Sequence, residues 1–230
     1  MAVHRFEATI RELKELSPSV KHFRLSSPSA FTFKPGQFVV LSVPNPSGKL
    51  VKRSYSIASP PKADEFELCV KGVPGGEASP YLFSRKEGDT LQCQGPLGAF
   101  VVKDEANALV LVGTGTGVAP YRAMVQDLLE RGFKKNILLL CGYRHEEEVL
   151  YDKEFSHLAK LHDNFHYHPV VSRPAPGYRG AVGRVQQLIE AYAKEVNADF
   201  YLCGLTEMID DVKKLLEEKG AKRIFFERYD

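Results

Sequence analysis

The pattern of apolar residues changes once along this 230-residue chain, near residues 101–107. Before that point, short segments alternate apolar with polar residues, which is typical of antiparallel strands with one face toward a core. After it, short and fully apolar segments alternate with amphipathic segments of helix length, which is typical of parallel strands covered by helices on both faces. The sequence therefore predicts two domains, residues 1–104 and residues 105–230.

The first domain is predicted to be an antiparallel six-stranded barrel with one short helix. Its strands are regularly spaced and separated by residues that favour turns, such as Pro35-Gly36 and Pro74-Gly75-Gly76. The predicted strands are residues 6–16, 20–25, 37–43, 53–58, 65–71 and 90–94, and the helix lies near residues 79–84.

The second domain is predicted to be an α/β domain with a parallel sheet. Its apolar runs are about five residues long, far short of the roughly 20 residues that cross a bilayer, so they are expected to be buried strands. The predicted strands are residues 108–112, 137–142, 166–171, 199–203 and 223–227, and the predicted helices are residues 118–131, 151–160, 183–194 and 206–219.

Composition argues against several functions. The net charge is +2, with 31 basic and 29 acidic residues, so the chain lacks the excess of Lys and Arg that nucleic-acid binding needs. Its four cysteines lie far apart, which argues against a disulfide scaffold, a zinc site and an iron–sulfur cluster. His162, His166 and His168 could place two side chains on one strand face, but a metal needs a third ligand. We therefore predict no metal site.

The start of the chain lacks the apolar core of a signal peptide. We therefore expect a cytoplasmic protein without a membrane span.

A glycine-rich segment, Gly113 to Pro120, follows a predicted buried strand and opens a predicted helix. Backbone N–H groups at such a position suit a diphosphate. The segment is not the dinucleotide fingerprint G-x-G-x-x-G, because Val118 occupies the place of the third glycine, and it lacks the Lys of a P-loop. The alternative is a structural turn without a ligand.

Two further segments in the first domain carry candidate binding residues. Arg53-Ser54-Tyr55-Ser56 combines a cation, an aromatic ring and hydroxyl groups on one strand, which suits a ligand with a ring and a phosphate; the alternative is an ordinary amphipathic strand. Gly75 and Gly76 precede the short helix, with Ser79 as its predicted N-cap, and form a second candidate phosphate site.

These motifs, taken in order, closely resemble the ferredoxin–NADP reductase family of flavoproteins. The resemblance covers essentially the whole chain and implies the fold described above, with a flavin-binding barrel and a domain that binds pyridine nucleotide. The motifs that carry it are Arg53-x-Tyr55-Ser56, Gly76-x-x-Ser79-x-x-Leu82, Gly113 to Pro120, Tyr201-x-Cys203-Gly204 and Phe226-Glu227-x-Tyr229.

The resemblance implies a flavin site in the barrel. Arg53 is expected to reach the flavin phosphates, Tyr55 to stack on the isoalloxazine ring, and Ser56 to hydrogen-bond near N5, which accepts the hydride. FAD rather than FMN is implied by the resemblance alone. The further flavin-site residues are Ser54, the backbone of Cys69, Val70 and Lys71, and the pyrophosphate cradle of Gly75, Gly76 and Ser79.

The resemblance also implies a nucleotide site and a catalytic set. Cys203 and Gly204 are expected beside the nicotinamide, although Cys203 could be a plain buried thiol. Ser56, Cys203 and Glu227 are expected to align nicotinamide with flavin, and Tyr229 to cover the flavin face; here Asp230 follows Tyr229, whereas the aromatic residue is last in many relatives. The expected pyrophosphate residues are Gly113, Thr114, Gly115, Thr116, Gly117 and Pro120.

The choice of NADP or NAD depends on the 2′-phosphate, a dianion that needs cations or hydroxyls. Arg144, Ser172 and Arg173 resemble family positions that receive this phosphate, and Arg184 adds a third cation. An acidic residue on the ribose would instead indicate NAD, and residues 146–148 are all Glu. We interpret these glutamates as a solvated turn and expect NADP(H).

The predicted function is hydride exchange between NADP(H) and FAD, with single electrons passed to or from a separate ferredoxin or flavodoxin. The alternative enzyme is an NADH-dependent reductase component of an oxygenase or of another multi-protein electron-transfer system. A third hypothesis, from another class, is a nucleotide-binding module without flavin. We expect a monomer or a weak dimer.

Overall fold

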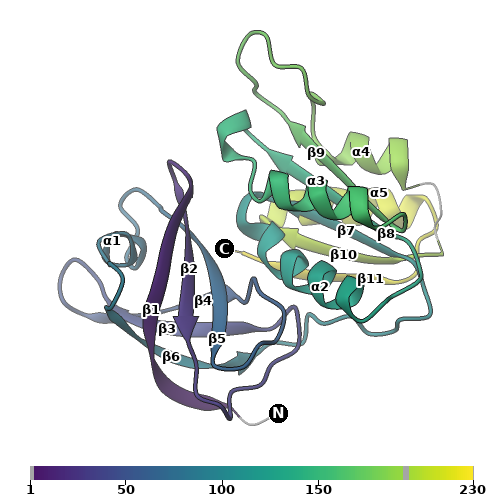
Figure 1. Ribbon diagram of the computed structural model, residues 1–230. Coiled ribbons are helices and arrows are strands. Elements are labelled where there is room, and N and C mark those ends of the chain that lie inside the picture. Colours follow the sequence, from purple (N-terminus) through teal and green to yellow (C-terminus); the bar gives the residue numbers. More distant parts are fainter. Residues whose placement is uncertain (1–2, 194–196, 230) are drawn as a thin grey trace. The chain divides into compact units, whose positions relative to one another are not determined.

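The computed structural model describes residues 3–193 and 197–229 (Figure 1). The predicted end of a helix at residue 194 and the expectation about Asp230 lie outside these residues. The chain forms two compact units, Met1–Val102 with Ala119–Asp127, and Lys103–Val118 with Leu128–Asp230. Ala119–Asp127, which is part of a helix, therefore belongs to the first unit.

The first unit contains a six-stranded antiparallel sheet in the order β4-β3-β6-β1-β2-β5. A bridge between Ile57, which directly follows the edge strand β4, and Leu68, in the middle of the other edge strand β5, closes the sheet as the predicted barrel. The elements are β1 (His4–Ser17), β2 (Val20–Ser26), β3 (Phe38–Pro44), β4 (Leu50–Ser56), β5 (Glu65–Lys71), α1 (Ser79–Phe83) and β6 (Thr90–Leu97).

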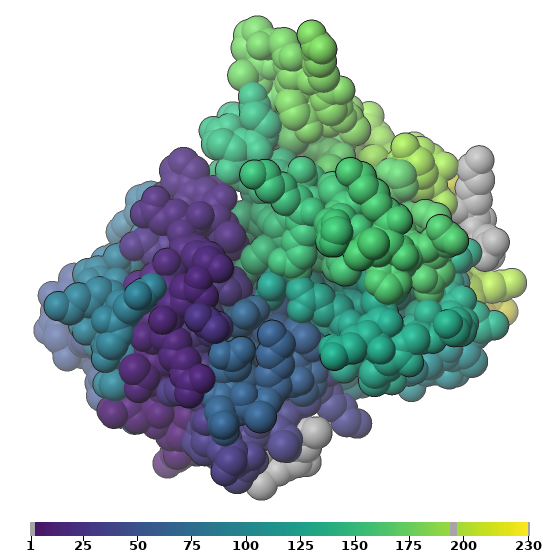
Figure 2. Space-filling view, viewed as in Figure 1, coloured from purple at the N-terminus to yellow at the C-terminus, as the bar shows by residue number. Residues whose placement is uncertain are grey.

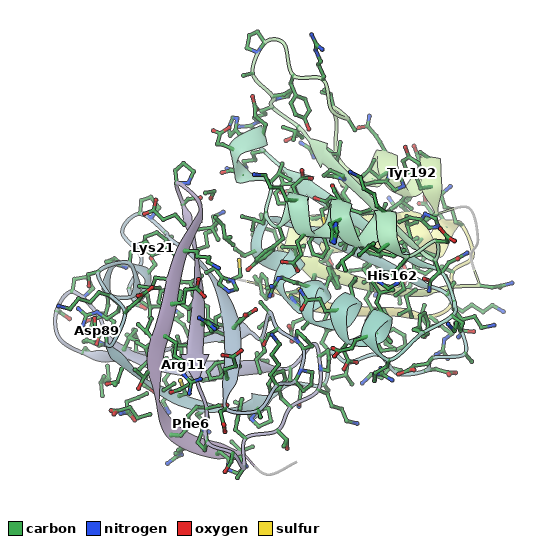
Figure 3. The ribbon with its side chains drawn as sticks, viewed as in Figure 1. Phe6, Arg11, Lys21, Asp89, His162 and Tyr192 are labelled. Atoms are coloured by element: carbon green, nitrogen blue, oxygen red, sulfur yellow. The ribbon has the colours of Figure 1, made fainter. Side chains whose placement is uncertain are left out.

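Alternation along the strands builds the barrel core. In β3, Val39, Leu41 and Val43 are buried while the residues between them are only partly covered, as the period of two requires. Aromatic rings fill the interior at one end, where the centroids of Phe6 and Phe31 lie 4.9 Å apart (Figure 3 labels Phe6). The predicted flavin-site residues therefore lie on a barrel with a well-packed core.

The second unit contains a parallel five-stranded sheet in the order β11-β10-β7-β8-β9, as predicted. The helices α4 and α5 pack on it through a shared core that includes Val112, Leu140, Ile189, Leu202 and Val212. The elements that follow the barrel strands are β7 (Leu109–Thr114), η1 (Gly115–Val118), α2 (Ala119–Glu130), β8 (Ile137–Tyr143), η2 (Glu146–Glu148), α3 (Asp152–Leu161), β9 (Phe165–Val171), α4 (Val185–Tyr192), β10 (Asp199–Gly204), α5 (Thr206–Glu218) and β11 (Ile224–Arg228). Of these, α2 belongs to the first unit over Ala119–Asp127, and the others belong to the second unit.

The strands β1, β2, β4 and β6 of the barrel are longer than predicted, and β4 ends at Ser56 rather than at residue 58. β4 begins at Leu50, because the turn from Asn45 to Gly48 brings Leu50 and Val51 into register with Pro44 and Val43. β6 continues to Leu97, where it still pairs with Phe38. Among the residues that the structure describes, no helix is long and apolar enough to span a membrane.

Candidate functional site

Arg53 and the Gly75-Gly76 turn come together in the barrel unit. The guanidinium group of Arg53, on β4, forms an ion pair with the carboxylate of Glu77, one residue after the turn. Arg53 also donates a hydrogen bond of 2.8 Å to the carbonyl of Lys52. Two motifs that are more than twenty positions apart in sequence therefore form one surface, as a single phosphate site requires.

The other residues of the β4 motif differ in burial. Tyr55 is partly buried against the barrel core, and this burial raises the pKa of its phenol to about 12. Ser56 is buried and Ser54 is exposed. The ring of Tyr55 therefore stays neutral and is held by packing, which suits a stacking surface.

The hydroxyl of Ser79 braces the glycine turn. Its Oγ accepts a hydrogen bond from the N–H of Val73 at 2.9 Å and donates one to the Val73 carbonyl at 3.0 Å. The N-cap of α1 is Ala78, so the prediction of Ser79 as N-cap is wrong; Ser79 is the first residue of the helix and bonds backward. A Cβ on Gly76 would lie 2.9 Å from both this hydroxyl and the Val73 carbonyl, so glycine is required.

The predicted ribityl segment lies on β5, an edge strand of the sheet. Cys69 and Val70 are buried and Lys71 is exposed, and all three pair with β2 on one side. On the other side, the bridge to Ile57 is made at Leu68, immediately before this segment. The segment thus lies at the point where the barrel closes.

In the second unit, the glycine-rich segment packs directly against Cys203. A Cβ on Gly117 would lie only 2.3 Å from the Cys203 carbonyl oxygen. A Cβ on Gly204 would lie 2.5 Å from Oγ1 of Thr114, and Gly204 has a φ of +151°. These glycines allow the turn after β7 and the end of β10 to approach closely, which is compatible with the single nucleotide site that the resemblance implies.

The side-chain oxygen of Thr114 is buried without a hydrogen-bond partner in the described part of the chain. A buried hydroxyl without a partner is costly, and a ligand can satisfy it. Gly113 and Thr114 end β7, Gly115 to Gly117 form η1, and Pro120 lies in the first turn of α2. This edge therefore fits a polar ligand such as a nucleotide pyrophosphate.

Three of the four predicted catalytic residues lie together in this unit. Cys203 and Glu227 are paired on the neighbouring strands β10 and β11, and the backbone N–H of Tyr229 donates to the Gly204 carbonyl at 2.9 Å. Burial raises the pKa of the Cys203 thiol, a hydrogen bond with the Tyr229 side chain opposes this rise, and the Glu227 carboxylate adds to it. Cys203 is therefore a neutral thiol; the fourth residue, Ser56, belongs to the barrel unit.

The predicted 2′-phosphate residues gather at one edge of the parallel sheet. The N–H of Arg173 donates to the Arg144 carbonyl at 2.8 Å, and Oγ of Ser172 donates to the Tyr143 carbonyl at 3.2 Å. The strand-like bridge between Val171 and Val182 leads the chain back to this edge just before Arg184.

The loop between β9 and α4 carries three of these four residues, Ser172, Arg173 and Arg184, and projects from the end of its sheet, where Figure 2 shows it as an exposed green protrusion. Arg144, Ser172, Arg173 and Arg184 are all exposed. In the described ranges, none of the three guanidinium groups pairs with a carboxylate. The positive charge here is therefore available to an anionic ligand.

Glu146 does not behave as part of a solvated turn. Both of its carboxylate oxygens accept the N–H of Ala175, at 3.2 Å each, so Glu146 holds the loop that carries Arg173. The interpretation of Glu146 as part of a solvated turn is therefore wrong, and sequence reasoning missed Glu77. The signal available for both was an acidic residue beside a motif that is expected to bind phosphate.

The three histidines considered as metal ligands do not converge. His162 is the C-cap that follows α3, and the ring of His168 stacks on that of Tyr192, with centroids 3.8 Å apart (Figure 3 labels His162 and Tyr192). No group of three or more metal-ligating side chains occurs within residues 3–193 and 197–229.

The antiparallel barrel and the parallel-sheet unit, each with a cluster of the predicted site residues, are the architecture expected of a two-domain oxidoreductase. Two family sequence models match the chain, the oxidoreductase FAD-binding domain at residues 7–102 and the oxidoreductase NAD-binding domain at residues 111–214. The chain is 38% identical over 239 residues to ferredoxin–NADP reductase B of Sorangium cellulosum, covering 98% of both chains.

Other relatives are components of larger systems. The chain is 33% identical over 236 residues to the reductase component of phenol 2-monooxygenase from Pseudomonas sp. strain CF600, covering 99% of this chain and 66% of that protein. It matches the cytochrome P450 reductase GcoB of Amycolatopsis with a TM-score of 0.88 and 29% identity, over 98% of this chain and 70% of that one.

These findings confirm the fold and the resemblance: the chain belongs to the ferredoxin–NADP reductase family of flavoprotein oxidoreductases. Its cofactors are FAD and a pyridine nucleotide. The matched domain models also settle the choice of FAD over FMN that the sequence left to resemblance.

Proposed function

We propose that this protein exchanges a hydride between NADP(H) and FAD and passes single electrons to or from a ferredoxin or flavodoxin. The observation that carries the choice of NADP(H) is the cluster of Arg144, Arg173 and Arg184, exposed cations without carboxylate partners in the described ranges at the edge of the nucleotide-type site. The full-length similarity to a ferredoxin–NADP reductase supports the same choice.

In this proposal the barrel, residues 1–104, holds the flavin. Arg53 binds a flavin phosphate beside the Gly75-Gly76 turn, which Ser79 keeps in shape through Val73. Tyr55 stacks on the isoalloxazine, and Ser56 hydrogen-bonds at the edge that accepts the hydride. Ser54 and the backbone of residues 69–71 complete the site.

Residues 105–230 hold the nucleotide. Gly113 to Gly117 and Pro120 bind its pyrophosphate, with Thr114 Oγ1 gaining the hydrogen-bond partner that it lacks. Arg144, Ser172, Arg173 and Arg184 bind the 2′-phosphate. This arrangement places the nucleotide on the carboxyl ends of parallel strands, where α/β sheets bind ligands.

Cys203, Gly204, Glu227 and Tyr229 then orient the nicotinamide. Bound FAD supplies the ability to accept two electrons together and release them one at a time. Cys203 remains a neutral thiol because burial raises its pKa, so it contributes shape and a weak donor rather than charge. Tyr229 is held by its backbone bond to Gly204, and its ring gates access to the flavin.

A second candidate is an NADH-dependent reductase component of an oxygenase. It is favoured by the similarity to the phenol 2-monooxygenase reductase and by the glutamates of η2. Glu146 already accepts the Ala175 N–H and holds the loop that carries Arg173, so one of these three glutamates has a structural role, which weakens the argument for NADH.

The test is electron delivery to a carrier. FAD-loaded protein is supplied with NADPH or NADH, a ferredoxin or flavodoxin, and cytochrome c as the final acceptor. The proposal predicts reduction that depends on the carrier and is much faster with NADPH. Reduction that prefers NADH and ignores both carriers would instead support the oxygenase-reductase candidate.

A further inference from the structure

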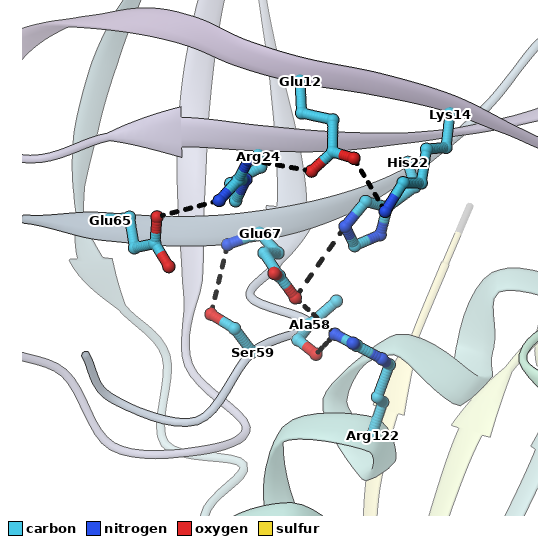
Figure 4. Close-up of polar contacts among 9 residues, drawn as sticks. All are labelled: Glu12, Lys14, His22, Arg24, Ala58, Ser59, Glu65, Glu67 and Arg122. Atoms are coloured by element: carbon cyan, nitrogen blue, oxygen red, sulfur yellow. Dashed lines mark hydrogen bonds and ion pairs between the residues drawn. The ribbon is translucent and has the colours of Figure 1, made fainter. Parts of the chain in front are cut away.

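A buried ion pair joins the helix after the glycine-rich turn to the barrel. Nη1 of Arg122, on α2, donates to Oε2 of Glu67 on β5 at 2.5 Å and to the Ala58 carbonyl at 2.8 Å (Figure 4). The two charged side chains are only 12% and 13% exposed. Neither residue belongs to any motif discussed above.

The surroundings hold Glu67 rigidly. Its backbone N–H donates to Oγ of Ser59 at 3.1 Å, and its carboxylate lies 3.8 Å from Nε2 of His22 on β2. Burial lowers the pKa of His22 to about 4, so the imidazole is neutral near pH 7 and leaves Arg122 as the charged partner of Glu67. Residue Glu67 is therefore contacted by Arg122 of α2, by His22 of β2 and by Ser59.

A buried ion pair is a poor means of gaining stability, because desolvation offsets much of the attraction. Such a pair does fix geometry, since any displacement leaves two charges buried and unpaired. The exposed pairs on the neighbouring part of β5 differ: Glu65 contacts Arg11 and Arg24 at 3.8 and 3.6 Å near solvent. Among these ion pairs of β5, the buried pair Glu67–Arg122 is therefore the one that can fix the position of α2 on the strand.

The helix that carries Arg122 is shared by the two units. Ala119–Asp127 belongs with the barrel, whereas the glycine-rich turn up to Val118 and the chain from Leu128 belong to the nucleotide unit. Glu67, in turn, lies two residues before the segment proposed to line the flavin. The Glu67–Arg122 ion pair therefore connects β5, which carries the proposed flavin segment, with α2, which follows the proposed nucleotide-binding turn.

We propose that Glu67 and Arg122 are positioning residues for hydride transfer: they anchor the start of α2 on β5 and so restrict the movement of the nucleotide-binding turn. This inference rests on the proposed function. Hydride transfer is sensitive to the placement of its two partners, and a misplacement of about 1 Å can cost ~100-fold in rate. Loss of the anchor should therefore slow the transfer itself rather than weaken FAD binding.

The experiment compares Arg122→Gln, Glu67→Gln and the double variant with Glu65→Gln as the control. Glu65 lies two positions away on the same strand and pairs only with arginines of the barrel in the described chain. The double variant removes both buried charges together, which guards against misfolding of a single variant that leaves one charge unpaired. Arg122→Lys keeps the charge and tests rescue.

Two readouts are measured on FAD-loaded proteins. Hydrogen exchange of the amides in residues 119–127 should become about tenfold faster in the anchor variants, because their helix opens locally. The limiting rate of flavin reduction at saturating nucleotide should fall about tenfold, with FAD affinity unchanged and partial recovery in Arg122→Lys.

Each possible outcome either supports or overturns the proposal. Unchanged exchange in residues 119–127 overturns the anchor, and faster exchange with an unchanged limiting rate overturns its role in positioning. The same losses in Glu65→Gln would also overturn it. If the unaltered protein binds FAD but neither NADPH nor NADH reduces it, the proposed function fails and the positioning role fails with it.

Discussion

The guanidinium group of Arg53 is ion-paired with the carboxylate of Glu77, at the place where a flavin phosphate is proposed to bind. The two side chains are 47% and 54% exposed, so the pair is weak and can be exchanged for a stronger partner. In the proposed function, a flavin phosphate displaces Glu77 from Arg53. This relationship gives the first prediction.

Glu77→Gln should raise the affinity of the protein for FAD. The carboxylate no longer competes with the phosphate for Arg53, and an exposed pair contributes up to about 1 kcal/mol, or roughly fivefold in affinity. Titration of flavin-free protein with FAD, followed by flavin fluorescence, measures this change. Glu15→Gln, on an exposed position of β1, is the control. Weaker FAD binding in Glu77→Gln would show that the carboxylate itself helps to hold the flavin.

Gly117→Ala should destabilise the nucleotide unit by about 1–3 kcal/mol, because its Cβ would lie 2.3 Å from the Cys203 carbonyl oxygen. It should also weaken NADP⁺ binding, since the turn must shift away from β10. Thermal unfolding and a nucleotide titration check both effects. Gly132→Ala is the matched control: its φ is +75° but its Cβ meets open space, so only backbone strain of about 1 kcal/mol is expected.

Arg173→Ala should weaken binding of NADP⁺ about tenfold and leave NAD⁺ binding nearly unchanged, because a charge-assisted hydrogen bond to the 2′-phosphate is lost. Calorimetric titration with each nucleotide measures the two dissociation constants, and NAD⁺ is the internal control. Equal losses for both nucleotides would place Arg173 elsewhere on the ligand and remove the argument for NADP(H).

His22 should make the protein less stable as the pH falls from 6.5 toward 4. Burial lowers its folded pKa to about 4, the carboxylates of Glu67 and Glu12 oppose this shift, and the cations of Arg122 and Lys14 add to it.

Between pH 6.5 and pH 4, His22 is protonated in the unfolded chain but stays neutral in the folded protein. Its contribution to the free energy of unfolding is therefore complete above pH 6.5 and is lost as the pH falls. The loss between pH 7 and pH 5 amounts to about 2 kcal/mol.

Thermal unfolding of His22→Asn at pH 7 and pH 5 checks this prediction. The variant should lose less stability on acidification than the unaltered protein does. His157→Asn, an exposed position of α3, is the control and should behave like the unaltered protein. An identical pH dependence in His22→Asn would mean that other groups cause the acid sensitivity.

The elements could be predicted because each depends on a local pattern. The alternation in β3 and the apolar run of β8 identify a half-buried and a fully buried strand without knowledge of their neighbours. The proximity of Cys203 to the glycine-rich turn was implied by the family resemblance, and it agrees with the rule that the carboxyl ends of parallel strands meet at one edge.

The polar contacts that fix the sites could not be predicted in this way. Arg53–Glu77, Glu146–Ala175 and Arg122–Glu67 join residues 24, 29 and 55 positions apart. The local sequence around Glu77, Glu146 and Glu67 is typical of a solvated turn or of the polar face of a strand. Which of them are engaged depends on how the barrel closes and where the loops return, and this information is not contained in any local window.

The most direct test of the central claim is an anaerobic titration of the FAD-loaded protein with NADPH and, separately, with NADH, following the loss of flavin absorbance. The account predicts that NADPH reduces the flavin at a much lower concentration than NADH, and that Arg173→Ala abolishes most of this difference. A preference for NADH, or no reduction by either nucleotide, would contradict it.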